Sequence, residues 1–328
     1  ILARNIVLLG SGAQAERFLM RLKEDKPPFI EVVAVFGITN GGSRSVFDTR
    51  IQGGVDDLVE YVRTHDVDDI VIAHPWSDDD GLYPLIERLL ELPTTIYLAT
   101  DLIGFRLNLR SAENNFASVP VSEIVEKPLS GWAFVAKFLE DRLLAVFLII
   151  LFSPVFLLTA IAIKLDSSGP IFYRQRRLGF NNRAFSIYKF RSMFAEEAAA
   201  DKTRQATVGD PRITRVGRFI RRTSIDELPQ LLNVLNGTMS LVGPRPLAVD
   251  HNEDYSKRIR GYFARHRVKP GITGWAQANG LRGETKEIAA MEARVRHDIY
   301  YAQNWSLLFD MQILLMTALI VIRGSNAR

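Results

Sequence analysis

Two neighbouring carboxylates, Asp226 and Glu227, follow a pair of arginines in the segment RRTSIDELPQLL, residues 221–232. An ionised aspartate can act as a nucleophile toward phosphorus, and two carboxylates can hold Mg²⁺ together with the phosphate oxygens of a substrate. The nearby arginines, which include Arg221, can bind phosphate through their guanidinium forks. These residue types at this spacing predict phosphoryl chemistry, with Asp226 as candidate nucleophile and Asp226 and Glu227 as candidate Mg²⁺ ligands.

The start of a helix is expected to present these carboxylates. Proline is tolerated only in the first turn of a helix, so Pro229 predicts a helix that begins near Asp226 and continues through Leu235. Its free N–H groups and the preceding arginines would bind a phosphate, and the same positive field would lower the pKa of Asp226 and keep it ionised. The pattern Ser224-x-x-Glu227 also matches a capping box, so these acids could instead only cap the helix.

Positive charge is concentrated around the acids. From Arg174 to Arg222 the chain has thirteen lysines and arginines against four acids, although the formal net charge of the whole chain is only +4. Such a segment is typical of a surface that binds the phosphates of nucleotides, nucleic acid or lipid head groups, and a solvated basic face is the alternative. Further along, Arg245 stands between two prolines, which restrict its backbone and favour a bidentate phosphate contact over an ordinary turn.

Short β-branched runs alternate with helical patterns over the first hundred residues, which predicts an α/β fold of parallel strands and crossover helices. The segment Gly10-Ser11-Gly12-Ala13-Gln14-Ala15 is the GxGxxA form of a dinucleotide fingerprint. The second strand, VVAVFGITN, ends without the acid that would bind a ribose. We therefore expect a Rossmann-like, CoA- or NAD-binding-like domain over residues 1–110 with a structural or regulatory role, and a linker over residues 111–136.

An uncharged stretch follows the linker. The twenty-one residues from Leu143 to Ile163 carry no charge, and about 20 helical residues cross the hydrocarbon core of a bilayer. Pro154 removes a backbone hydrogen bond near the centre, so the helix should bend there, with the Ser153 hydroxyl as the nearest partner for the freed carbonyl. Because cationic residues flank both ends, we expect a re-entrant membrane hairpin over residues 137–165 rather than a kinked crossing.

Residues 166–328 are more polar and form the predicted catalytic domain. Its last apolar segment, residues 305–324, contains Asp310 and Gln312 and so predicts an interfacial helix or one packed under this domain. The chain has no cysteine, which excludes thiolate nucleophiles and Cys-ligated metals. Because the first residue is Ile1, we expect upstream sequence, including any membrane segment there, to be missing from this chain.

Several motifs in one order resemble a known family, the monotopic phosphoglycosyl transferases or bacterial sugar transferases, over residues 137–323. The segments that carry the resemblance are KFLEDRLLAVFLIILFSPVFLLTAIAIKLDSSGPIFYRQRRLG, IYKFRSM, DPRITRVGRFIRRTSIDELPQLLNVLNGTMSLVGPRP and RHRVKPGITGWAQANGLRGET. The resemblance implies a mainly helical α+β monotopic catalytic domain. With its N-terminal domain the chain is similar to the large members, which begin exopolysaccharide, capsule or O-antigen synthesis on the cytoplasmic face of the bacterial inner membrane.

The resemblance also implies a reaction. Sugar 1-phosphate would pass from a UDP-sugar to polyprenyl (undecaprenyl) phosphate with release of UMP, through a phosphosugar intermediate on Asp226, while Glu227 would serve as the partner acid at Mg²⁺. By their positions in the motifs, four residues would hold phosphates: Lys189, Arg191, Arg221 and Arg245. The family often has Lys-Arg where this chain has Lys137-Phe138, and Arg142 would then supply the missing charge at the lipid head groups.

Other interpretations remain open at this point. The triplet Asp78-Asp79-Asp80 could be the metal site of a glycosyltransferase that releases UDP rather than UMP. A non-enzymatic membrane regulator would keep every activity after the substitution Asp226→Asn. Nucleic acid is not an expected partner, because the basic segment lacks interleaved aromatic residues for base stacking. The sequence does not identify the sugar, a ligand of the N-terminal domain, the oligomeric state (a homodimer among the options) or the number of missing upstream membrane helices.

Overall fold

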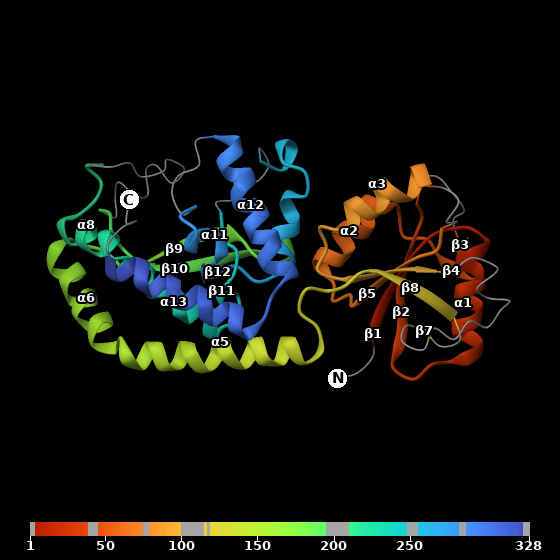
Figure 1. The fold of residues 1–328 in the computed structure, drawn as a ribbon, viewed down its shortest axis with the longest axis horizontal. Helices are drawn as coiled ribbons and strands as arrows, with labels where there is room; N and C mark the ends of the chain where they lie inside the picture. The colour runs from red at the N-terminus through yellow and green to blue at the C-terminus, as the bar shows by residue number, and fades with distance from the viewer. Residues whose placement is uncertain are drawn as a thin grey trace. The chain divides into compact units, whose positions relative to one another are not determined.

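The computed structural model describes residues 4–38, 45–74, 79–99, 115–116, 119–194, 210–247, 255–281 and 287–323. The chain forms two compact units, residues 1–127 and residues 128–328. Figure 1 shows the elements of each unit.

Unit 1, residues 1–127, is built around a sheet whose strands run in the order β2-β1-β5-β6-β8-β7. Its described elements are β1 (Arg4–Leu9), α1 (Ala13–Asp25), β2 (Ile30–Phe36), β3 (Ser45–Val46), β4 (Thr49–Arg50), α2 (Val55–Thr64), β5 (Asp69–Ile72), α3 (Asp79–Leu89), β6 (Thr95–Ala99), β7 (Asn115–Phe116) and β8 (Val119–Val125). Strands β2, β1, β5 and β6 pair in parallel, which confirms the predicted Rossmann-like arrangement.

Alternate residues of β1 belong to different cores. Val7 and Leu9 pack in a cluster with residues of α2 and α3, whereas Ile6 and Leu8 pack in a second cluster with residues of α1. Side chains alternate between the two faces of a strand, so helices cover both faces of this sheet. Gly10 directly follows β1, and a Cβ atom at this position would collide with the backbone of Ala73 after β5. Close packing of neighbouring segments therefore accounts for the first glycine of the fingerprint.

The linker expected over residues 111–136 is corrected by the structure. Strand β8 lies within it and pairs antiparallel with β6, so this part of the chain extends the sheet of unit 1. The following helix begins at Gly131 rather than near residue 137. Pro120 and the polar residues of VPVSEIV obscure the strand pattern, and backbone pairing with β6 compensates for the weak local preference.

Unit 2, residues 128–328, contains longer helices and two small sheets. Its described elements are α5 (Gly131–Leu151), α6 (Ser153–Asp166), β9 (Phe172–Leu178), η1 (Phe180–Asn182), β10 (Ala184–Phe190), α8 (Arg215–Arg222), η2 (Ile225–Glu227), α9 (Gln230–Leu235), β11 (Ser240–Val242), η3 (Tyr262–Arg267), β12 (Gly271–Thr273), α11 (Trp275–Ala278), α12 (Ile288–Gln303) and α13 (Leu307–Arg323), where η denotes a 3₁₀ turn. Strands β9 and β10 form an antiparallel hairpin, and β11 and β12 pair in parallel. The main core joins residues of α5, α9, β11, α12 and α13.

Helices α5 and α6 form one bent apolar pair. The bend is 60°, and within the described residues no single helix is long and apolar enough to cross a membrane, whereas this pair taken together passes on length and composition. At the bend, the Ser153 hydroxyl donates to the Ile150 carbonyl at 2.8 Å. That carbonyl stands four residues before Pro154, which has no N–H to donate, so the predicted role of Ser153 is confirmed.

The apolar C-terminal segment forms α13, which Figure 1 shows alongside α5. Asp310 and Ile313 are fully buried, whereas Leu308 is 81% exposed. One side of α13 therefore packs into unit 2 and the other is an exposed apolar face, which agrees with the expected helix packed under the catalytic domain.

Candidate active site

Asp226 and Glu227, called the DE pair below, lie in the turn η2 between α8 and α9. Ser224 adopts a left-handed conformation with φ of 58°, which separates η2 from α8, and α9 begins only at Gln230. The predicted helix start near Asp226 is therefore wrong by about one turn. The Ser224 side chain makes no capping hydrogen bond, so the capping-box interpretation is also wrong.

Glu227 is the centre of an ion-pair cluster. Its Oε1 accepts from Lys189 Nζ at 2.9 Å and from Arg245 Nη2 at 2.7 Å, and its Oε2 accepts from Arg245 Nη1 at 3.2 Å. Lys189 comes from β10, and Arg245 follows β11 in the segment Gly243-Pro244-Arg245-Pro246. Three side chains predicted from separate motifs thus meet, and the negative charge of the buried Glu227 is compensated by two cations.

Asp226 is in a different state from its neighbour. Burial and the charge of Glu227 raise the pKa of Asp226 to about 6, although Lys189, Arg221 and Arg245 act in the opposite direction. The expectation of a lowered pKa is therefore wrong: the three cations do lower the pKa of Asp226, but burial and the charge of Glu227 outweigh them. Within the part of the chain that the structure describes, the Asp226 carboxylate has no hydrogen-bond partner. Its oxygens are available for a ligand or for attack.

Arg191 does not join this cluster. It is 4% exposed, and its guanidinium donates to the carbonyls of Ser167, at 2.8 Å, and of Ser168, at the end of α6. A guanidinium that donates to the carbonyls at the C-terminal end of a helix interacts favourably with the helix dipole, and these donors are then not directed at a phosphate. The expected phosphate contact is corrected to a role in holding α6. Arg221, in the last turn of α8, is close enough to Asp226 to influence its pKa.

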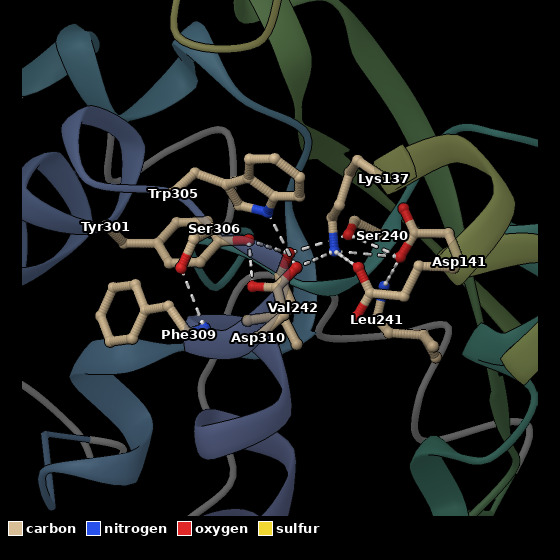
Figure 2. Close-up of polar contacts among 11 residues, drawn as sticks. Lys137, Asp141, Ser240, Leu241, Val242, Tyr301, Trp305, Ser306, Phe309 and Asp310 are labelled. Carbon is tan, nitrogen blue, oxygen red and sulfur yellow. Dashed lines mark hydrogen bonds and ion pairs between the residues drawn. The ribbon is translucent and has the colours of Figure 1, made fainter. Parts of the chain in front are cut away.

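Lys137, at the start of the family motif, lies in a second, buried cluster. Lys137 is 6% exposed, and its Nζ lies 2.6 Å from Asp310 Oδ2 and 3.2 Å from Asp141 Oδ1 (Figure 2). Asp310 also accepts from the Tyr301 hydroxyl and the Trp305 indole, each at 2.9 Å. This buried Lys137 cluster ties α5 to α12 and α13.

The same cluster extends to the strand that precedes Arg245. Asp141 Oδ1 accepts from the Leu241 N–H and from the Ser240 hydroxyl, both at 2.9 Å. These two residues belong to β11, which ends three residues before Arg245 (Figure 2). Helix α5 is therefore connected through side-chain contacts to the segment that carries Arg245. Arg142, one residue further along α5, stacks its guanidinium over the Phe138 ring at 4.6 Å.

Three buried residues beside the site, Arg265, Arg294 and Asp298, were not predicted. Arg265 in η3 donates from Nη2 to the Arg245 carbonyl at 2.8 Å, and the same nitrogen lies 2.7 Å from Asp298 Oδ2 in α12. Arg294 and Asp298 lie one helical turn apart on the buried side of α12, and this spacing is the signal that could have indicated them.

Some predicted features fall outside the described residues. These are Asp78 of the acidic triplet and residues 195–209 of the basic segment. Among the residues that the structure describes, no group of three or more His, Asp or Glu side chains is placed to hold a metal ion.

Comparison with known proteins identifies the class. The bacterial sugar transferase family matches residues 132–324, and the CoA-binding domain family matches residues 1–100. The first match covers more than half of the chain and contains every residue of the ion-pair cluster. The chain belongs to the bacterial sugar transferase family, which confirms the resemblance found in its motifs.

Individual relatives carry more specific names. The chain is 44% identical over 277 residues to a UDP-glucose:undecaprenyl-phosphate glucose-1-phosphate transferase of Xanthomonas campestris pv. campestris, covering 84% of this chain and 57% of that protein. It is 41% identical over 315 residues to the Escherichia coli (strain K12) protein of the same name, covering 96% and 67%. A UDP-N-acetylgalactosamine-undecaprenyl-phosphate N-acetylgalactosaminephosphotransferase of Aeromonas hydrophila is 44% identical over 201 residues, covering 61% and 47%. The chain thus spans between about half and two thirds of these relatives.

Proposed function

We propose that this chain transfers a sugar 1-phosphate from a UDP-sugar to polyprenyl (undecaprenyl) phosphate and releases UMP. The observation that carries the proposal is the state of the DE pair: Glu227 is compensated by Lys189 and Arg245, while Asp226 beside it has no hydrogen-bond partner among the described residues. A carboxylate left available next to cations suits a nucleophile toward a phosphate substrate. The names of the relatives support both substrates.

In the proposed mechanism, an oxygen of ionised Asp226 attacks the sugar-bearing phosphorus of the UDP-sugar. The bond from that phosphorus to the bridging oxygen breaks, and UMP leaves with the electron pair. A phosphate oxygen of the polyprenyl phosphate then attacks the same phosphorus and displaces Asp226, which gives polyprenyl-diphosphate-sugar. One phosphoanhydride replaces another, so the site mainly has to relieve the crowding of negative charge, and Arg221 and Arg245 are the cations placed to do so.

The residues present fit the proposed Mg²⁺ ion. Two adjacent carboxylates lie together, and the pKa of Asp226 is raised by burial and by the charge of Glu227, a state in which a bound cation would be favoured. Asp226 and Glu227 would hold the ion together with substrate phosphate oxygens, as is usual for Mg²⁺. When bound, the ion would neutralise charge that develops on the phosphates.

We further propose that α5 and α6 enter the cytoplasmic face of the bacterial inner membrane as a re-entrant hairpin. The 60° bend, the satisfied Ile150 carbonyl and the uncharged sequence support this arrangement. Several bulky apolar side chains of the pair are exposed, among them Leu143, Phe147, Ile150, Leu158 and Leu165. A polyprenyl phosphate in the same leaflet would then reach a site held against the membrane.

The test combines product analysis with detection of the intermediate. Purified protein is incubated with Mg²⁺, polyprenyl phosphate and a panel of UDP-sugars, with UDP-glucose first because two relatives carry that name. We expect release of UMP and not UDP. Without the lipid acceptor, mass spectrometry should show a sugar phosphate on Asp226, and the variant Asp226→Asn should lack both adduct and turnover. UDP release, or full turnover by the variant, would contradict the proposal.

A further inference from the structure

Arg245 reaches Glu227 from a backbone that is restrained on both sides. The Pro244 carbonyl accepts from the Gly271 N–H at 3.0 Å, which holds the peptide before Arg245. The next peptide joins Arg245 to Pro246. Because proline has no N–H, the Arg245 carbonyl is the only hydrogen-bonding group of that peptide. That carbonyl accepts from Arg265 Nη2 at 2.8 Å. Arg265 therefore supplies the hydrogen bond that fixes this second peptide.

Arg265 is poorly explained as a stabilising residue. Its side chain is fully buried, and Asp298 compensates its charge at 2.7 Å. Within the described residues, its Nε and Nη1 donate to no carbonyl or carboxylate, and the guanidinium lies 5.8 Å from the centre of the Tyr262 ring. Unsatisfied donors on a buried charge cost free energy, and buried ion pairs are often no more stable than apolar residues of similar size. A residue kept under these conditions is better explained by the orientation it imposes on its neighbour.

We propose that Arg265 is a positioning residue that acts through Arg245. Asp298 orients the Arg265 guanidinium, Arg265 fixes the Arg245 carbonyl, and the Arg245 side chain is thereby aimed at Glu227 and the reacting phosphate. The proposal rests on the function proposed above for this site. It predicts that replacing Arg265 lowers kcat through the displacement of Arg245, and therefore has little further effect when Arg245 has already been replaced.

A double-mutant cycle tests this dependence. UMP release is measured for the wild type, Arg265→Met, Arg245→Met and the double variant. A displacement of about 1 Å can reduce turnover by about 100-fold, so we expect Arg265→Met to lower kcat by about 10- to 100-fold with a smaller change in KM for the UDP-sugar. The double variant should be no more than about twofold slower than Arg245→Met alone. Losses that multiply would overturn the proposal.

Val295→Ala is the matched control for general damage. Val295 is 1% exposed in the same helix as Asp298, and its side chain has no hydrogen-bonding group. It should lower the melting temperature without the loss of kcat seen for Arg265→Met. Equal loss of kcat in both variants at equal stability would mean that Arg265 is only structural.

A measurement without turnover separates this proposal from the proposed function. Hydrogen–deuterium exchange of peptides covering residues 241–247 and 268–274 should be at least about tenfold faster at the Gly243 and Gly271 amides, which hydrogen-bond this segment, in Arg265→Met than in the wild type or Val295→Ala. Unchanged exchange would overturn the positioning role, whereas absent UMP release in the wild type would overturn only the proposed function. If Arg265→Met does not fold, Arg265→Lys, which keeps the charge opposite Asp298, is judged by the same criteria.

Discussion

At the scale of single residues, the two carboxylates of the DE pair differ in their contacts and are proposed to have different roles. Glu227 is compensated by Lys189 and Arg245, while Asp226 keeps its oxygens available at the cost of a raised pKa. The adjacent acids were recognisable in the sequence because their types and spacing are local. Their charge states were not, because the rise in the pKa of Asp226 comes mainly from its burial, which depends on the fold around it.

The raised pKa predicts a pH dependence of activity. Asp226 must be ionised to attack, and its pKa is about 6, so kcat/KM should be constant above pH 7 and fall about tenfold per pH unit below pH 6. Saturating Mg²⁺ should shift this fall in kcat/KM to lower pH, since a bound cation favours the charged carboxylate and lowers its pKa. A pH–rate profile at low and high Mg²⁺ checks both expectations, and a flat profile down to pH 5 would contradict them.

The same shift predicts a stability change of known sign. The folded protein holds this proton more tightly than the unfolded chain, so Asp226 contributes stability below pH 4 that is lost as the pH rises through about 6. Without Mg²⁺ at pH 7.5, Asp226→Asn should therefore melt about 2–4 °C higher than the wild type. At pH 4.5 the difference should be clearly smaller, because Asp226 is then protonated in the folded protein although still partly ionised in the unfolded chain. Differential scanning calorimetry at both values measures it, and a less stable variant at pH 7.5 would refute the assignment.

At the scale of helices and strands, the Lys137 cluster connects α5 with β11 and α13. Replacing Lys137 by Met would leave three buried carboxylates, those of Glu140, Asp141 and Asp310, without their cation. Removing one partner from a buried ion pair costs about 3–5 kcal/mol, so Lys137→Met should lower the free energy of unfolding by that amount. Lys164→Met, at an exposed lysine of α6, should change it by less than about 1 kcal/mol. Denaturation in one detergent compares them, and equal effects would argue against the cluster.

The re-entrant arrangement of α5 and α6 can be tested directly because the chain contains no cysteine. Ser130 and Ser168 are exposed and stand just outside the two ends of the helix pair. In a re-entrant hairpin, the variants Ser130→Cys and Ser168→Cys should both react with a membrane-impermeant maleimide in inverted vesicles and not in intact spheroplasts. Labelling of the two positions from opposite sides would instead demonstrate a crossing helix.

At the scale of the whole molecule, local sequence patterns predicted more of unit 1 than of the contacts in unit 2. Strands β1, β2, β5 and β6 were predictable because each is a short apolar run between helical patterns. Strand β8 was not, because its place depends on pairing with β6. The partners of Lys137 and Arg265 were missed for a related reason: Asp310 is 173 residues from Lys137, and the Arg265 contact to Arg245 spans 20 residues. Such contacts follow from the fold of unit 2, not from residue spacing.

The division into two units leads to a final prediction about where the activity resides. Every residue proposed to act, from Lys189 to Arg265 and its partner Asp298, lies in unit 2, which has its own hydrophobic cores. A chain limited to residues 128–328 should therefore fold and release UMP from the UDP-sugar with kcat within about threefold of the full chain. The control is the same shortened chain with Asp226→Asn, which should be inactive. A folded but inactive unit 2 would show that unit 1 contributes to the reaction. The Rossmann-like domain would then have a catalytic role instead of the expected structural or regulatory one.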